Sequence, residues 1–113
     1  MNVKLVLVKP RDKGNGRSFA LQKAKTTIGR ETDCDLQIPA ASVSRHHCEI
    51  ESSDERVVVR DEGSSNGTFV NQQRVQGEIE LEPGDTLAIG PAAFRVVING
   101  KSKPANARPA AAT

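Results

Sequence analysis

Short apolar segments recur about every ten residues along this chain, and turn-forming residues separate them. Val, Ile, Leu and Thr dominate the segments and alternate with polar residues, which is typical of half-buried β-strands. No stretch keeps a helical apolar period over ten residues. The pattern therefore predicts an all-β sandwich or barrel. The expected strands are 3–8, 17–23, 26–29, 36–38, 47–51, 56–60, 68–70, 78–81, 86–89 and 94–98.

The chain has 113 residues, enough for one domain with a single core. We expect residues 1–100 to form this domain. Residues 101–113, "KSKPANARPAAAT", combine Pro, Ala and basic residues without apolar periodicity. We interpret this segment as a flexible tail or the stub of a linker.

Composition argues against several classes of protein. The net charge is only +2, the basic residues are scattered, and Trp and Tyr are absent, so nucleic-acid binding is not expected. No apolar run reaches the roughly 20 residues of a transmembrane helix, and the alternating N-terminus does not resemble a signal peptide. We therefore expect a cytoplasmic protein with no membrane association. The cysteines, Cys34 and Cys48, are interpreted as reduced thiols.

The residues whose side chains could bind a ligand or react fall in three turns. These are "IGRETDCD" at 28–35, "SVSRHHC" at 42–48 and "EGSSNGTFVN" at 62–71. Loops at one end of a sandwich can form a recognition site on a rigid scaffold. Guanidinium, hydroxyl and amide donors suit an oxyanion such as a phosphate, which offers three acceptor oxygens. The donors are Arg30, Arg45, Ser44, Ser65 and Asn66, and Gly29 and Gly67 permit close backbone approach.

Three blocks in this order, "GR" at 29–30, "SRHH" at 44–47 and "SSNGT" at 64–68, resemble the signature of the forkhead-associated (FHA) domain family. The "FVN" at 69–71 fits the short apolar-Asn turn that follows in that family. The resemblance covers roughly residues 3–100. It implies an FHA-like β-sandwich of about eleven strands in two sheets, with recognition loops at one end. It also implies a non-catalytic module that binds phosphothreonine in partner proteins of Ser/Thr kinase signalling.

The resemblance implies a role for each matching position. Arg30 and Ser44 would hold the phosphate, Ser65 would add a hydroxyl bond, and Arg45 would assist as a basic residue after the serine. Asn66 would bind the peptide main chain. His47 would support the binding loops, and Gly29 and Gly67 would be structural. His46 fills a variable position and inherits no role. We expect the turn at 90–93 to contribute to the choice of flanking residues.

This sequence departs from the family pattern at two positions. Ser65 stands where Thr is common, which keeps the hydroxyl and loses a methyl group. Gln72 follows Asn71 where Gly is usual, so we expect that hairpin to turn differently.

Other interpretations compete with phosphopeptide binding. Ser44 near His47 could be a nucleophile with its base, but a hydrolase also needs an orienting acid and an oxyanion hole, so no enzyme activity is expected. His46, His47 and Cys48 offer metal ligands, but neighbours in a strand point to opposite faces, so neither a metal nor another cofactor is expected. A structural assembly module, pairing through a sandwich face without phosphate, remains open. Binding of a phosphorylated Thr113 in the chain's own tail also remains open. A monomer that binds phosphothreonine in partner proteins is favoured.

Overall fold

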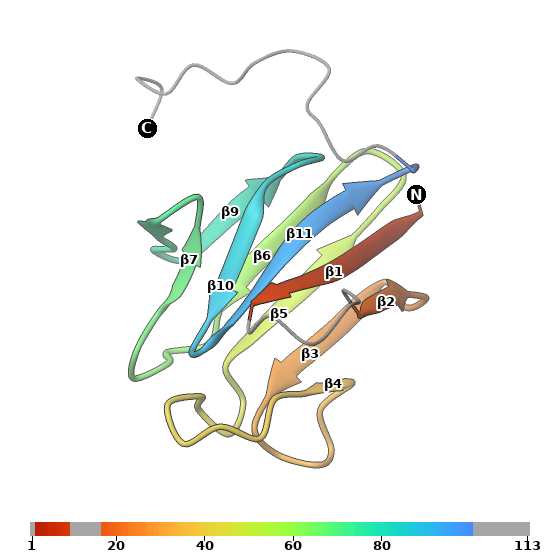
Figure 1. Cartoon of the computed structure of the whole chain (residues 1–113). Helices are drawn as coiled ribbons and strands as arrows, with labels where there is room; N and C mark the ends of the chain where they lie inside the picture. The colour runs from red at the N-terminus through yellow and green to blue at the C-terminus, as the bar shows by residue number, and fades with distance from the viewer. Residues whose placement is uncertain (1, 10–16, 101–113) are drawn as a thin grey trace.

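The computed structural model describes residues 2–9 and 17–100, and in these residues eleven strands form two sheets (Figure 1). The tail predicted at 101–113 lies outside the described residues. The strands are β1 (Val3–Lys9), β2 (Ser18–Leu21), β3 (Lys25–Gly29), β4 (Leu36–Gln37), β5 (Cys48–Ser52), β6 (Val57–Asp61), β7 (Thr68–Val70), β8 (Gln73–Arg74), β9 (Glu78–Leu81), β10 (Thr86–Ile89) and β11 (Ala92–Ile98).

The two sheets have the orders β2-β1-β11-β10-β7-β8 and β4-β3-β5-β6-β9. The strand pairs are antiparallel except for β3 and β4, which run parallel over a short register. Among the described residues there is no helix of the length and hydropathy that a membrane crossing requires. The all-β, two-sheet sandwich of eleven strands predicted from the sequence is confirmed.

The core lies between the sheets, and it follows the alternation that the sequence shows. In β5, Cys48 and Ile50 are buried, while Glu49 and Glu51, which alternate with them, are half-buried. In β11, Phe94, Val96 and Ile98 are buried. Because successive side chains of a strand point to opposite faces, β5 and the second half of β11 give every second residue to the core. Burial of these apolar faces is the main force that holds the sheets together.

Ten of the eleven strands lie where the sequence predicts them, within a few residues. The prediction missed β8, whose two residues, Gln73 and Arg74, are polar and exposed, so no apolar alternation marks them. The expected strand at 47–51 begins one residue later, at Cys48, and His47 belongs to the preceding loop.

The three polar turns lie at one end of the sandwich. The loop 30–35 follows β3, the loop 38–47 precedes β5, and the loop 62–67 joins β6 to β7. In Figure 1 these loops lie at the lower end, together with the short turn between β10 and β11. The antiparallel pairing of β3 with β5 and of β5 with β6 explains this placement, because β3 and β6 end where β5 begins.

The β7–β8 hairpin turns through Asn71 and Gln72, which have φ of 50° and 72°. Positive φ at both central residues is the property of a type I′ turn. Asn71 is fixed there: its Oδ1 accepts a hydrogen bond from the Thr86 N–H at 3.0 Å, and its Nδ2 donates to Asp85 at 2.9 Å. Gln72 occupies the second position, which glycine usually fills, with an exposed side chain. The expectation that this hairpin turns differently is therefore wrong: Gln72 takes the left-handed backbone that glycine usually supplies, at a conformational cost.

We predict that Gln72→Gly raises the free energy of unfolding by roughly 0.5 kcal/mol, as measured by urea denaturation. Relief of the left-handed backbone at this position outweighs the extra chain entropy that glycine gives the unfolded state. Gln22→Gly is the matched control, because Gln22 is also exposed and does not have a positive φ. The free energy of unfolding of Gln22→Gly should fall by about 0.4–1 kcal/mol. Equal losses in both variants would contradict the prediction.

Candidate functional site

His47 lies fully buried between two of the loops. Its Nδ1 accepts a hydrogen bond from the backbone N–H of Ser44 at 3.0 Å. Its Nε2 lies 2.9 Å from the carbonyl oxygen of Gly67. Because Nδ1 must offer a lone pair and a carbonyl can only accept, the proton of the neutral ring is on Nε2. The imidazole therefore joins the loop 38–47 to the loop 62–67 through backbone groups on both sides.

Both ring nitrogens of His47 are thus occupied by backbone atoms, and neither is bonded to the Ser44 hydroxyl. The arrangement is not that of a nucleophile and its general base, which must share a hydrogen bond. Cys48, the next residue, is also buried, and burial raises the pKa of its thiol to about 12. This thiol is a core group that stays protonated at neutral pH.

The end of β3 packs tightly against the loop 38–47 at Gly29. A Cβ at this position would collide with the carbonyl oxygen of Arg45 and would lie 2.9 Å from the Cys34 sulfur. The close approach allows the N–H of Arg30 to donate to the Ser44 carbonyl at 3.0 Å. Glycine is therefore required at position 29 because any side chain would push the two loops apart.

The Arg30 side chain is exposed but partly fixed, because its Nε donates to the carbonyl of Val43 at 3.0 Å. Among the residues described, its terminal nitrogens have no recorded protein partner. A guanidinium carries five N–H donors, so four remain for a ligand. The bond to Val43 limits the orientations of the group and leaves its outer edge available.

The hydroxyl of Ser44 joins the same loops from the outside. Its oxygen accepts a hydrogen bond from the N–H of Ser65 at 3.1 Å, so the hydroxyl proton can still be donated to a ligand. Next to it, Asn66 donates from Nδ2 to the carbonyl of Ser42 at 2.8 Å. Gly67 follows with φ of 89°, and a Cβ there would lie 3.0 Å from the Arg74 side chain. The loop 62–67 is therefore held against the loop 38–47 at several points.

Asp61, at the end of β6, organises the loop 62–67 from below. Its carboxylate accepts hydrogen bonds from the N–H groups of Gly63 and Ser64 and from the hydroxyls of Ser64 and Thr68, at 2.6–2.9 Å. The Ser64 oxygen in turn accepts the N–H of Gly67 at 3.0 Å. Neither Asp61 nor Ser64 was predicted from the sequence to have a role. An Asp two residues before Gly is the local signal of an Asx-type turn and could have indicated them.

An open pocket of about 530 Å³ lies above these contacts. It contains two guanidinium groups and two hydroxyls beside one carboxylate, Glu31, a set suited to an oxyanion. The pocket is lined by Arg30, Glu31, Ser44, Arg45, His46 and Ser65. All four residues predicted to hold the phosphate therefore line one pocket, and Asn66, the residue after Ser65, is not among the lining residues. The residues predicted to support the loops, Gly29, His47 and Gly67, are buried.

We predict that Asp61→Asn lowers the free energy of unfolding by roughly 2 kcal/mol at pH 7, because an amide can accept only part of these hydrogen bonds. Burial raises the pKa of the Asp61 carboxyl, but the bonds from Ser64, Thr68 and Gly63 lower it more, so the folded-state pKa lies below the ordinary value.

A carboxyl with a lowered pKa stabilises the folded state above its unfolded pKa, about 3.9, and this contribution is lost as the pH falls toward the folded value. The difference between wild type and Asp61→Asn, measured by urea denaturation, should be constant above about pH 5 and shrink below about pH 4. Val59→Ala, at a fully buried position that does not titrate, is the control, and its deficit should not change over this range. A deficit of Asp61→Asn that is independent of pH would refute the assignment.

Comparison with known proteins gives a family match over the region that holds the site. The family model of the FHA domain matches residues 26–90. The transcriptional regulatory protein EmbR of Mycobacterium tuberculosis is 40% identical over 78 residues, which are 69% of this chain and 20% of that protein. The oxoglutarate dehydrogenase inhibitor of Corynebacterium diphtheriae is 38% identical over 92 residues, 81% of this chain and 62% of that protein. The chain thus spans about a fifth to three fifths of the length of these relatives.

Solved structures share the fold. A structure from a study of phosphothreonine-dependent FHA domain interactions has a TM-score of 0.76 at 33% identity, covering 88% of this chain and 98% of that one. Mycobacterium tuberculosis EmbR, solved in complex with a low-affinity phosphopeptide, has a TM-score of 0.79 at 32% identity, covering 95% of this chain and 26% of that one. Together with the matching sequence region, these similarities show that the chain belongs to the FHA domain family.

Proposed function

We propose that this chain is a non-catalytic module that binds phosphothreonine in partner proteins, on segments phosphorylated by a Ser/Thr kinase. The observation that carries the proposal is the open pocket in which Arg30, Arg45, Ser44 and Ser65 converge from three separate loops. The comparisons support it, because EmbR was solved with a phosphopeptide and another similar domain was studied for phosphothreonine-dependent interactions.

In this proposal Arg30 supplies most of the charge for the phosphate. Its Nε is fixed on the Val43 carbonyl, so its terminal nitrogens face a phosphate as a pre-oriented fork. Ser44 donates its hydroxyl proton while its oxygen accepts the Ser65 N–H. The Ser65 hydroxyl adds another bond, and Arg45 adds a second positive charge. Hydrogen bonds to a charged group contribute roughly 1.5–3 kcal/mol each, so a few of them can support recognition of a short segment.

Asn66 would fix the main chain of the bound peptide beside the phosphoresidue. One amide hydrogen is used on the Ser42 carbonyl, which leaves the other hydrogen and Oδ1 for the peptide backbone. The bond to Ser42 also sets the orientation of the amide. Preference for phosphothreonine over phosphoserine would come from van der Waals contact with the threonine methyl group.

The turn at 90–93 is the proposed source of selectivity for flanking residues. It packs on the loop 38–47, since a Cβ added at Gly90 would lie 2.6 Å from the Val43 side chain and 3.0 Å from the Ser42 hydroxyl. The turn therefore borders the loop that carries Ser44. We expect micromolar affinity, about −8 kcal/mol, because a flexible peptide loses conformational freedom on binding. We further propose that the module acts as a cytoplasmic monomer.

The test is fluorescence polarisation with a degenerate peptide library in Thr, phosphoserine and phosphothreonine versions. We predict binding confined to the phosphothreonine peptides and a loss of at least 100-fold for Arg30→Ala, since two or more charge-assisted bonds disappear. Arg56→Ala is the matched control, because Arg56 is an exposed arginine in the β5–β6 turn, outside the pocket, and its removal should leave affinity unchanged.

Equal binding of phosphorylated and unmodified peptides, or equal affinity of Arg30→Ala and wild type, would refute phosphate recognition. In that case the mass of the protein in solution tests the alternative. A phosphate-independent dimer would support a structural assembly module. An equal loss of peptide affinity in Arg30→Ala and Arg56→Ala would indicate a nonspecific charge effect. It would also count against phosphate binding in the pocket.

A further inference from the structure

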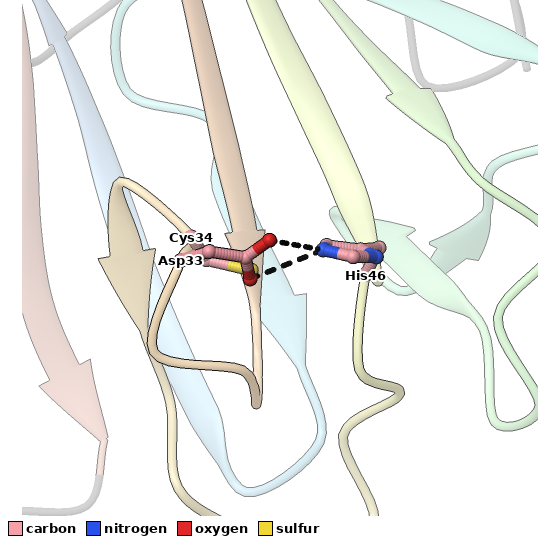
Figure 2. A group of neighbouring side chains, drawn as sticks. All are labelled: Asp33, Cys34 and His46. Carbon is pink, nitrogen blue, oxygen red and sulfur yellow. Dashed lines mark hydrogen bonds and ion pairs between the residues drawn. The ribbon is translucent and has the colours of Figure 1, made fainter.

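A second group of chemically active side chains lies next to the phosphate pocket, on Asp33, Cys34 and His46. Their carboxylate oxygen, sulfur and ring nitrogen all lie within 4.8 Å of one another. Figure 2 shows Asp33 and Cys34 directed toward the ring of His46. Asp33 and Cys34 come from the loop 30–35 and His46 from the loop 38–47, so two loops contribute. Phosphate recognition as proposed above uses none of these three side chains.

Backbone contacts hold the two loops in this arrangement. The N–H of Glu31 donates to the Arg45 carbonyl at 3.2 Å, and the N–H of Cys34 donates to the Glu31 carbonyl at 3.2 Å. The Cys34 thiol donates to the same Arg45 carbonyl at 3.3 Å. The sulfur is therefore fixed beneath the surface, with a residue exposure of 8%. Asp33 and His46 lie above it with side-chain exposures of 71% and 59%, so both can adjust around an ion.

The spacing of the His46 and Asp33 donors fits a small tetrahedral ion, and the Cys34 sulfur lies within 4.8 Å of both. The Nε2 of His46 lies 3.2 Å from each carboxylate oxygen of Asp33. Two ligands that bind zinc at about 2.0–2.1 Å lie ~3.3 Å apart in a tetrahedron, so this pair needs almost no movement. Thiolate, imidazole and carboxylate together favour zinc over Mg²⁺ and Ca²⁺, which prefer oxygen ligands alone.

We propose that Asp33, Cys34 and His46 form a zinc-binding site with three protein ligands and a fourth position open to water. On binding, the Cys34 S–H bond is replaced by a sulfur–zinc bond and the proton passes to solvent. Neutral His46 supplies the lone pair of Nε2. The thiolate and the Asp33 carboxylate together balance the charge of the ion, and the thiol gives up its hydrogen bond to Arg45.

The environment of Cys34 determines how this binding responds to protons. Burial raises the pKa of the thiol and the negative charge of Asp33 raises it further, whereas a backbone hydrogen bond with Glu31 lowers it, and the charges of Glu31 and Asp35 raise it least. A thiol must lose its proton to bind zinc, so one thiol proton is released for each ion bound. The same carboxylates attract the cation, so the electrostatics that keep the thiol protonated also favour the metal.

A different set of ligands suggests itself from the sequence alone. That set is His46 with His47 and Cys48, which cannot converge, and the structure shows His47 committed to the backbone of two loops. The group that does converge pairs His46 with residues of another loop, more than ten positions earlier. Adjacency in the sequence therefore pointed to the wrong partners.

The experiment is a zinc titration of the full chain in competition with a chromophoric chelator, with cobalt(II) absorption as a second readout. We expect one zinc per chain for the wild type, with release of the thiol proton, and a thiolate-to-cobalt charge-transfer band. His46→Ala and Cys34→Ala should each weaken zinc binding at least tenfold and abolish the cobalt band. The matched controls are Cys48→Ala, the other buried thiol, and Asp54→Asn, an exposed carboxylate in the β5–β6 turn, and both should bind zinc like the wild type.

Thermal unfolding gives an independent measure, because a ligand that binds only the folded state raises Tm. Saturating zinc should raise the Tm of the wild type and of Cys48→Ala but not of His46→Ala, whose exposed ring can be removed without opening the core. The proposal is overturned if the wild type binds no zinc at micromolar concentrations, or if His46→Ala binds it as tightly as the wild type. It is equally overturned if the cobalt band persists in Cys34→Ala and is lost in Cys48→Ala.

Discussion

The buried imidazole of His47 is the contact on which the recognition end of this sandwich depends. It accepts the N–H of Ser44 on one side and donates to the carbonyl of Gly67 on the other, with no exposure to water. A buried backbone group without a partner costs about 1–3 kcal/mol, so loss of the ring would leave two such groups unpaired. No apolar side chain can replace it, because the position needs one acceptor and one donor at opposite ends of a rigid ring.

Because the His47 ring joins the two loops, the side chains that line the pocket are left to bind a ligand. The loops are held to one another by backbone atoms, by Asp61 below and by the Arg30–Val43 contact at the side. The Arg45 side chain and the hydroxyl protons of Ser44 and Ser65 are therefore not needed to keep the loops in place. A site built in this way loses little freedom when an anion binds, because the ordering cost was met during folding.

The sequence predicted most of the fold because alternation and turn residues mark ten strands directly. It did not predict β8, because Gln73 and Arg74 pair through the geometry of the Asn71–Gln72 turn and bury nothing. The four residues predicted to hold the phosphate were identified through the resemblance of three motif blocks to the FHA signature, whereas Asp61 and the Asp33–Cys34–His46 group were not identified. The Asp33–Cys34–His46 group depends on which loops lie side by side, and that follows from the pairing of β3 with β5. Asp61 bonds within its own loop, and its local signal, an Asp two residues before Gly, was overlooked.

Arg45 connects the two sites at this end of the molecule. Its side chain lines the pocket proposed to bind phosphate, while its carbonyl accepts the Glu31 N–H and the Cys34 thiol. A zinc-bound sulfur would no longer donate to that carbonyl, and the ion would instead hold His46, the next residue, from the other side. Both ligands therefore act on the backbone at 45–46. Any coupling between them must be reciprocal, because an ion that changes phosphopeptide affinity by a given factor has its own affinity changed by the same factor.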